Sequence, residues 1–450
     1  MKKFIAMLLL GCMLLSMVAC GSKTEPETAE PSEAVKEESA NEATIPSEEP
    51  ITLTIWTNSG IIAPDELKLP EEDRYLNKAF AKFQEIYPNV EFEVVNYGDD
   101  TPQMVNDFKA AMMAGEGPDI ITPFSGGTVL DLSGGLVCMN DYLTEDLLNN
   151  MVGWDSIATD FDASKEIWGI PYAGQSVASI GYNKSLVKAA GLDWENNPPQ
   201  TREELYAALD AIRDSGVEPF HVDESYSMLL LYNLSLWWEQ ESGLDAIVSH
   251  MTEGTLFAED QGFLNMLEEY KKFYDNGWVN SDTATSADGT SYFLQGKSAL
   301  FPVGMWDLDM MRESLGDDYG IIMMPGLNGT GPCALGGCGT ALCVANFSDN
   351  VDMAVEFAKF MASKEIMITH YQAIPSVPIR TDITAEDIGK ADDPIFKQCV
   401  EIASSIYYWP DNCMSVDAAN IWYSNMPSQV LVGAMTPLEL AQMMDEAQAD

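Results

Sequence analysis

The sequence predicts an α/β protein with two lobes, and three features of the chain support this. Segments with the two-residue period of a strand alternate with segments that have the period of an amphipathic helix, a pattern typical of mostly parallel sheets flanked by helices. The chain has 450 residues, and without its polar N-terminal segment it still exceeds the length at which a single core stops growing. Hydrophobic residues, 46% of the total, suffice to fill two cores.

The first part of the folded region predicts a regular series of strands and helices. Residues 51–57 alternate between apolar and polar and predict a strand, and residues 90–97 predict another. Between them, residues 73–87 carry apolar side chains at helical spacing and end before a proline. A second helix at 103–114 leads to a short strand at 120–121.

A capping box marks the next helix along the chain. Thr201 is its predicted N-cap residue and Glu204 occupies the third helical position. The helix ends at Gly216 and leads to a strand at 217–220. The remaining elements are a predicted strand at 298–303 and predicted helices at 308–315, 349–363 and 436–447.

The N-terminal residues predict export and a lipid anchor. Lys2 and Lys3 precede the apolar run 4–18, which is shorter than the about 20 residues of a membrane span, so residues 1–19 are expected to be a signal peptide. The residues leading into Cys20 resemble a bacterial lipobox, whose cysteine receives a diacylglycerol, although Met17 stands where leucine is usual. The alternative is an ordinary signal peptide followed by an incidental cysteine.

Residues 20–50 predict a disordered acidic tether. Between positions 21 and 50 there are nine Glu and two Lys, with almost no large apolar side chain. Such a segment cannot bury enough apolar surface to offset its conformational entropy. We therefore expect a body that folds beyond residue 50 and is held at the extracytoplasmic face of the membrane.

The charge of the chain limits its partners. The formal net charge is −48, and no basic patch is present to bind nucleic acid. The mean field also disfavours a strongly anionic ligand, although the N-terminus of a helix could locally override it. A neutral or cationic partner is therefore expected.

The cysteines leave two states open. Beyond the tether the thiols can be buried and free or joined in disulfides, since an exported protein can form them. Three of them are spaced by five residues, which is not the paired spacing of a zinc site. The cysteines are Cys138, Cys333, Cys338, Cys343, Cys399 and Cys413.

No catalytic motif is complete, so we expect no enzyme and no cofactor. The three histidines are near no partner motif, and residues 174–178 lack the second glycine of a nucleophile elbow because Ala178 replaces it. Residues 296–298 resemble the end of a phosphate loop, but Ser291 stands where the earlier glycine would be needed. Carboxylates are too numerous for a glycosidase pair to be excluded by counting.

Aromatic side chains lie where a sugar could use them. Trp56 ends the first strand and is followed by Asn58, and Trp306 with Asp307 follows a later strand. These positions are at the carboxyl ends of strands, where open α/β sheets form their crevices. Aromatic rings can stack on the C–H faces of sugars, and packing in the core is the alternative for each ring. Further flat faces are offered by Tyr172, Trp237 and Trp238.

A series of short motifs runs through almost the whole folded region. In their order and spacing they resemble family-1 extracellular solute-binding proteins, the lipid-anchored receptor subunits of carbohydrate ABC importers. The motifs lie at residues 53–57, 83–90, 115–120, 168–172, 181–184, 199–205, 293–301, 304–306 and 354–360.

The resemblance implies a periplasmic-binding-protein-like fold. Each of its two lobes is an α/β sandwich, and crossing strands connect them at a hinge, with crossings expected near 172–175, 280–284 and 331–334. The N-terminal lobe is then expected at 51–173 and 284–332, and the C-terminal lobe at 174–283 and 333–450.

The resemblance also implies ligand contacts in the cleft between the lobes. Asp119 could instead cap a turn, and Arg380 could be part of a surface salt bridge, which contributes little to stability. The implied contacts are Trp56, Asn58, Asp119, Tyr172, Trp306, Asp307, Gly337 and Arg380, and the aromatic pair Trp237 and Trp238 is added as a candidate.

The function implied is that of a monomeric receptor, anchored through a lipid on Cys20, that binds a sugar and delivers it to ABC permease subunits. An oligosaccharide is the expected ligand, with no metal or cofactor. Three alternatives remain: a polyamine or other cation receptor of the same fold, a receptor for a phosphorylated polyol, and a surface glycoside hydrolase. The second would need several basic residues in the cleft, and the whole chain has 23 Lys and Arg.

Overall fold

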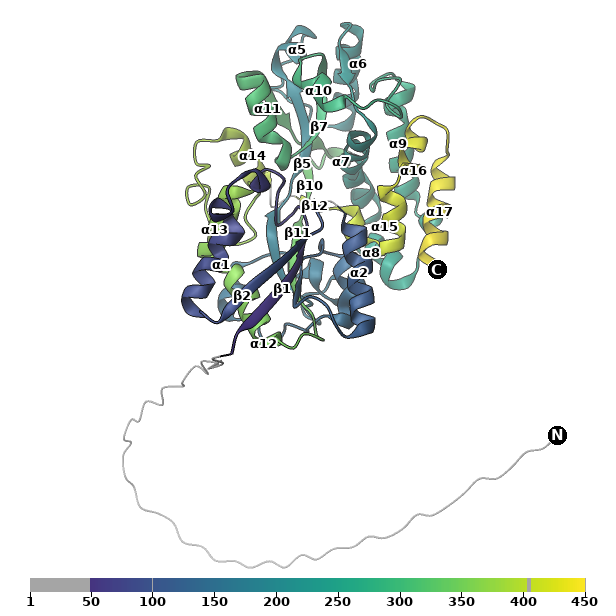
Figure 1. Cartoon of the computed structure of the whole chain (residues 1–450). Coiled ribbons are helices and arrows are strands. Elements are labelled where there is room, and N and C mark those ends of the chain that lie inside the picture. The colour runs from purple at the N-terminus through teal and green to yellow at the C-terminus, as the bar shows by residue number, and fades with distance from the viewer. Residues whose placement is uncertain (1–48, 99, 403–405, 450) are drawn as a thin grey trace, which may run out of the picture. The chain divides into compact units, whose positions relative to one another are not determined.

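The computed structural model describes residues 49–98, 100–402 and 406–449, which form two β-sheets with helices around them (Figure 1). The predicted signal peptide, Cys20 and nearly all of the predicted tether are outside the described residues. No helix in the described part of the chain is both long and apolar enough to cross a bilayer.

The first sheet has five strands in the order β2-β1-β3-β11-β4. Strand β1 pairs in parallel with both β2 and β3, whereas β11 runs antiparallel to β3 and β4. The strands are β1 (Ile51–Thr57), β2 (Val90–Asn96), β3 (Ile120–Ile121), β4 (Ile170–Gln175) and β11 (Cys338–Val344).

The second sheet has seven strands, with the path β12-β10-β5-β7-β6, and β8 and β9 paired at its side with β5 and β10. Strand β7 is antiparallel to β5 and parallel to β6. The strands are β5 (Ala178–Asn183), β6 (Glu218–Phe220), β7 (Ser298–Gly304), β8 (Tyr319–Ile322), β9 (Met324–Pro325), β10 (Pro332–Gly336) and β12 (Ile406–Tyr408).

Helices associated with the first sheet come from both ends of the chain. Helix α1 packs against α12 and α13, so segments nearly 300 residues apart share one core. These helices are α1 (Tyr75–Ile86), α2 (Thr101–Ala114), α3 (Gly127–Leu132), α4 (Glu145–Asn150), α12 (Val351–Met361) and α13 (Lys364–Ala373).

The remaining helices accompany the second sheet, and α7 is the central one. It packs against β7, β10 and α9, and eleven of its residues are buried around its circumference. The helices of this group are α5 (Lys184–Ala189), α6 (Arg202–Asp214), α7 (Glu224–Ser242), α8 (Leu244–Glu253), α9 (Gln261–Asp275), α10 (Gly289–Leu294), α11 (Leu308–Leu315), α14 (Pro394–Ile402), α15 (Val416–Tyr423), α16 (Met426–Leu431) and α17 (Pro437–Ala449).

Aromatic rings fill the core beside the first sheet. Phe83 of α1, 1% exposed, meets Phe357 of α12 edge to face with ring centroids 5.1 Å apart, and Phe92 of β2 lies 4.8 Å from Phe357. Such pairs contribute about 0.5–1.5 kcal/mol each beyond the burial of their area. This cluster attaches the C-terminal helices to the N-terminal strands.

The chain passes between the sheets at two adjacent points. Residues 176–177 join β4 to β5, and Gly337 alone joins β10 to β11. The backbone N–H of Ser176 donates to the carbonyl of Gly337 at 3.3 Å, so the two connections lie side by side. A third connection runs from α13 of the first sheet to β12 of the second.

The pairing of the strands corrects the expected division of the later segments. Residues 284–332 were expected with the N-terminal strands, but β7 pairs with β5 from Ala178–Gly304 to Tyr182–Leu300. The expected crossing near 280–284 is wrong because Val279 bridges to Phe220 and the chain stays with the second sheet. Likewise, β11 was expected with the C-terminal lobe and lies in the first sheet.

The cysteines of the body carry free thiols, five of them buried and Cys138 exposed. Burial raises the pKa of the Cys338 thiol to about 12. Within the described residues no group of three or more His, Cys, Asp or Glu could hold a metal ion.

Candidate functional site

A cavity of about 670 Å³ lies where segments from both sheets meet. It is lined by residues that follow the carboxyl ends of β1, β3, β7 and β12, the edge at which α/β sheets form crevices. The first sheet and its helices contribute Ser59, Gly60, Ala63, Pro64, Phe124, Ala173, Ser176, Gly339, Thr340, Ile374, Pro375 and Ser376. The second contributes Ser225, Tyr226, Met228, Leu229, Tyr232, Met305, Trp306, Trp409, Asp411, Asn412 and Tyr423.

Trp306 is held at the cavity by the turn that follows β7. The indole ring packs directly against the backbone of Gly304. Any larger residue would clash there, because a Cβ on Gly304 would lie 2.2 Å from the ring. The carboxylate of Asp307 accepts hydrogen bonds from the N–H of Gly304 at 2.9 Å and from the hydroxyl of Tyr226 at 3.0 Å. Trp306 remains 55% exposed, whereas Asp307 is buried and acts on the turn.

Trp409 is the second indole of the cavity and follows β12. Its backbone N–H donates to the carbonyl of Gly336 at 3.1 Å, which holds it to the neighbouring strand β10. Its ring lies 6.2 Å from that of Trp306, and Tyr232 of α7 meets it edge to face at 5.1 Å. Three rings from separate elements thus form one aromatic wall.

Asp411 brings a carboxylate to the same wall. Its Oδ2 accepts a hydrogen bond from the hydroxyl of Tyr423, while its Oδ1 is buried and has no hydrogen-bond partner in the structure. Burial raises the pKa of the Asp411 carboxyl above its usual value, and the hydrogen bond that Tyr423 donates opposes that rise.

Asn58 holds the loop of the first sheet that reaches the cavity. Its amide donates to the carbonyl of Thr122 at 2.9 Å, and its Oδ1 accepts from the N–H of Gly60 at 2.9 Å. The side chain is fully buried. Asn58 therefore positions Ser59 and Gly60, which line the cavity, and does not line it itself.

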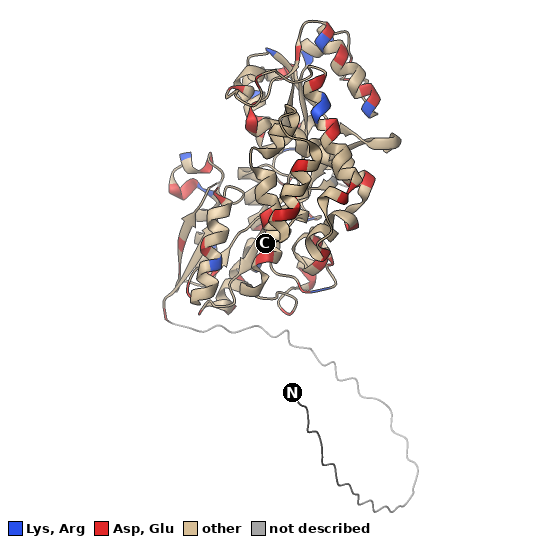
Figure 2. Ribbon diagram, turned by 90° about the vertical axis from the view of Figure 1, so that its right-hand side faces the viewer, with Lys and Arg blue, Asp and Glu red and all other residues tan. Residues whose placement is uncertain are grey.

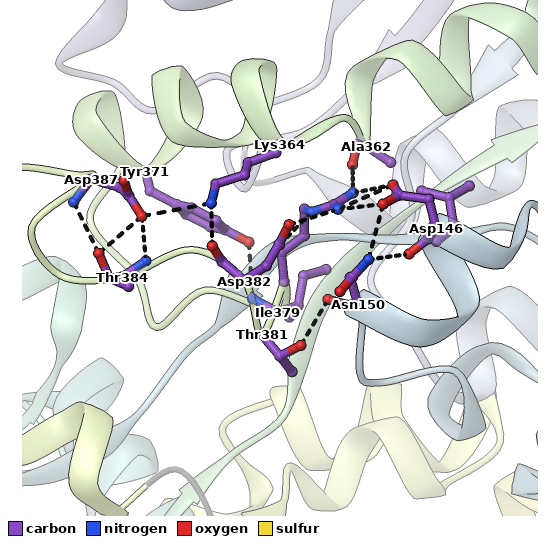
Figure 3. A network of polar contacts seen from close by, with 12 residues as sticks. Asp146, Asn150, Ala362, Lys364, Tyr371, Ile379, Thr381, Asp382, Thr384 and Asp387 are labelled. Atoms are coloured by element: carbon purple, nitrogen blue, oxygen red, sulfur yellow. Dashed lines mark hydrogen bonds and ion pairs between the residues drawn. The ribbon is translucent and has the colours of Figure 1, made fainter.

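Arg380 holds another lining segment through hydrogen bonds to Asp146, Asp382 and Ala362, three residues labelled in the polar network of Figure 3. Its guanidinium is 2% exposed and donates to both carboxylate oxygens of Asp146, to those of Asp382, and to the carbonyl of Ala362 at 3.0 Å. The backbone of Arg380 itself forms an antiparallel bridge with Met151. This network fixes the stretch after α13, whose first residues 374–376 line the cavity.

We expect Arg380→Met to lower the free energy of unfolding by about 3 kcal/mol, because it removes a buried charge that holds two carboxylates and a carbonyl together. Urea denaturation would measure the loss. The matched control is Arg312→Met, whose 41% exposed side chain pairs with Asp309 and Asp393 and should contribute about 1 kcal/mol or less. Equal losses in the two variants would contradict the assigned role of Arg380.

The other residues predicted from sequence do not line the cavity. Trp56 packs on Tyr97 with ring centroids 5.7 Å apart. Asp119 accepts from the N–H of Thr54 in β1 at 2.7 Å and from the hydroxyl of Ser348, so it links β1 to the segment that follows β11. The indoles of Trp237 and Trp238 are 2% and 0% exposed and donate to the carbonyl of Pro325 and to Asp260. The structure gives these four residues partners within the fold.

Tyr172 and Gly337 lie near the crossings between the sheets. Tyr172 is fully buried in β4 next to His370, with ring centroids 4.8 Å apart, and burial lowers the pKa of that histidine to about 3. Gly337 adopts a φ of 121°, a conformation that favours glycine, and a Cβ there would lie 3.2 Å from the ring of Tyr408. Neither Tyr172 nor Gly337 lines the cavity.

Sequence reasoning missed Trp409, Asp411, Tyr232 and Tyr423. Trp409 follows a short aromatic strand just as Trp306 follows β7, so recognition of the strand at 406–408 would have found it. Tyr232 lies on a helix that is buried nearly all round, and such a helix has no polar face to mark which side meets a ligand.

Comparison with known proteins places this arrangement in a family. Residues 78–398, more than half of the chain, match the family described as bacterial extracellular solute-binding protein. The chain belongs to this family. The solute-binding protein is thus related to binding proteins that work outside the cytoplasm.

Curated relatives cover most of the solute-binding protein. It is 22% identical over 362 residues to the maltotriose-binding protein of Pyrococcus abyssi, which covers 76% of this chain and 70% of that protein. It is 24% identical over 396 residues to the galactooligosaccharide-binding protein of Bacillus subtilis, covering 84% of this chain and 80% of the relative.

Solved structures share the fold. A chitin oligosaccharide binding protein superposes with a TM-score of 0.72 at 21% identity, covering 89% of this chain and 98% of that one. The solute-binding protein therefore has the two-lobed periplasmic-binding-protein-like fold, with one lobe around each sheet and the cavity between the lobes.

Proposed function

We propose that this protein is an extracytoplasmic receptor that binds an oligosaccharide in the cavity between its lobes and presents it to the permease of an ABC importer. The observation that carries the proposal is the aromatic wall of Trp306, Trp409 and Tyr232, because flat rings pack against the C–H faces of sugar rings. The names of the relatives, which bind maltotriose, galactooligosaccharides and chitin oligosaccharides, support the same ligand class.

The lining also provides hydrogen-bonding groups for hydroxyls. Ser59, Ser176 and Thr340 face the cavity from the first lobe, and Asp411 and Asn412 face it from the second. A volume of about 670 Å³ is within the range of about 300–1,000 Å³ that small-ligand sites occupy. A ligand that touches both lobes favours the state in which they are closed upon it.

The strand order of the two sheets supports a division of the chain into two lobes. The first lobe takes the described residues of 49–175 and 338–390, and the second takes those of 178–336 and 391–449, with 176–177 and Gly337 as crossings. The placement of α14 in the second lobe is supported by the ion pair of Arg312 with Asp393, 2.5 Å, beside that helix. In this function the protein binds the sugar and breaks none of its bonds. The protein would act as a monomer, and a lipid on Cys20 would hold it at the membrane.

The test is a thermal-shift series on the mature chain with malto-, galacto- and chito-oligosaccharides. A ligand at 100 times its Kd should stabilise the protein by about 2.7 kcal/mol and raise its Tm. Recovery of the intact ligand after incubation would exclude glycoside hydrolysis. A response to polyamines alone, with none to any saccharide, would contradict the proposal and favour the cation receptor of the same fold.

A further inference from the structure

Asp411 is the one charged residue among those that line the cavity, and no Lys, Arg or His is among them. Acidic positions also outnumber basic ones along the ribbon of the body (Figure 2), in a chain with 71 Asp and Glu against 23 Lys and Arg. The charged group that a ligand in the cavity would meet is therefore a carboxylate, which disfavours an anionic ligand.

The carboxylate of Asp411 lacks a counter-charge within the protein. Its two neighbours, Tyr232 and Tyr423, are neutral phenols, and its buried Oδ1 has no partner. A buried carboxylate oxygen without a hydrogen bond or a cation costs free energy, which a suitable ligand group can remove.

Two more carboxylates lie behind this wall. Glu239 accepts from the backbone N–H of Tyr408 at 3.0 Å, and the hydroxyl of Tyr408 donates to Asp155 at 2.5 Å. Burial raises the pKa of Glu239 to about 7. The contacts of Glu239, Asp155 and Asp411 in the described chain are all with neutral groups, so no basic residue neutralises them.

The rings around Asp411 suit a cation as well as a sugar face. Trp409 is two residues away, its ring meets Tyr232 at 5.1 Å, and Tyr423 bonds the carboxylate directly. The negative face of an aromatic ring attracts an ammonium group, most strongly when the group is removed from water. A cavity-lining carboxylate with an unpartnered oxygen among such rings combines the two interactions that recognise a protonated amine.

We propose that the ligand is a saccharide that carries a protonated amino group, and that this group binds at Asp411 while the sugar rings stack on Trp306 and Trp409. The inference rests on the proposed function and specifies its substrate class. A hydroxyl group could occupy Oδ1 of Asp411 but would leave its charge uncompensated, whereas an ammonium group supplies both a donor and the opposite charge. The same carboxylate disfavours uronate and phosphorylated sugars.

Isothermal titration with matched trisaccharides tests the inference. The three ligands are the β-1,4 trimers of glucosamine, N-acetylglucosamine and glucose, titrated near neutral pH into the mature chain. We expect the glucosamine trimer to bind about tenfold or more tightly than the other two, from the added cation–π and charge interactions. Asp411→Asn keeps an acceptor for Tyr423 and should remove this preference.

The matched control is Asp417→Asn, an exposed carboxylate on α15 of the same segment, which should leave the preference unchanged. The comparison within the wild-type protein is independent of the variants, so it decides the question even if Asp411→Asn lowers the Tm. Equal or tighter binding of a neutral trimer would overturn the inference while leaving the oligosaccharide receptor intact. If neither the trimers nor any other saccharide bound, both the inference and the proposed function would be contradicted.

Discussion

Trp306→Ala is expected to weaken binding of the oligosaccharide by a factor of about 30, which corresponds to about 2 kcal/mol. The ring has few contacts to lose within the free protein because it is 55% exposed, so its removal should act on the ligand more than on the fold. Its ring lies beside that of Trp409, with centroids 6.2 Å apart, so its removal takes away part of the aromatic wall on which a sugar is proposed to stack. Isothermal titration of wild type and variant gives the ratio of the two Kd values.

Trp56→Ala provides the contrast. Sequence reasoning treated the two tryptophans alike because both follow strands, but Trp56 packs on Tyr97 and does not line the cavity. Its replacement should change the Kd by less than about threefold while lowering the Tm. If Trp56→Ala reduced affinity as much as Trp306→Ala, the cavity would not be the ligand site.

Gly127→Ala is expected to lower the free energy of unfolding by about 3 kcal/mol, at the upper end of the cost of overpacking. A Cβ at Gly127 would lie 1.9 Å from the carbonyl oxygen of Met414, and backbone cannot rotate away as a side chain can. A Cβ at the neighbouring Gly126 would lie 2.1 Å from the carbonyl oxygen of Asn412, whose side-chain amide donates to Ser125 at 3.0 Å. The start of α3 thus packs directly on the segment that carries Asp411 and Asn412.

Gly134→Ala is the matched control, two turns further along the same region. Its Cβ would meet only the terminal methyl of Met112 at 3.7 Å, an ordinary contact, so it should change stability by about 0.5 kcal/mol or less. Urea denaturation of both variants measures the difference. A Gly127→Ala protein as stable as the control would show that the close packing of residues 126–127 on 412–414 does not exist in solution.

Local elements could be predicted from the sequence because their signals are local. The helix at 202–214 starts as its capping residue predicts, with Thr201 Oγ1 accepting from the N–H of Glu204 at 3.2 Å. The reciprocal half of the capping box differs, since the carboxylate of Glu204 accepts from Gln200 instead. The predicted strand at 51–57 is confirmed, with Leu53 and Ile55 on its buried face.

The pairing of distant strands could not be predicted in the same way. β7 and β11 are both buried strands, and nothing in their residues distinguishes a partner in the first sheet from one in the second. The pairing is decided by tertiary packing, which joins β7 to β5 and β11 to β3. The assignment of these segments to lobes was therefore the weakest part of the sequence-based prediction.

The prediction of ligand contacts was limited in the same way, because it also depends on tertiary contacts. Polar residues at the ends of strands were expected to face a ligand, but Asn58 and Asp119 satisfy backbone groups of neighbouring strands instead. A sequence shows which polar side chains lie at the ends of strands. It does not show whether a backbone N–H or carbonyl nearby lacks another hydrogen-bond partner and takes up such a side chain. Arg380 illustrates the point, since its donors are used on Asp146, Asp382 and Ala362.

The exposure of Trp306 has a practical consequence. All ten tryptophans are in the described residues, and among them Trp306 is the most exposed to solvent. Indole emission shifts toward the blue when the ring leaves water, so a ligand stacked on Trp306 and Trp409 would alter the fluorescence of these two residues, while the tryptophans that do not line the cavity give the background. The protein thereby carries its own optical reporter of occupancy at the position where the ligand is proposed to bind.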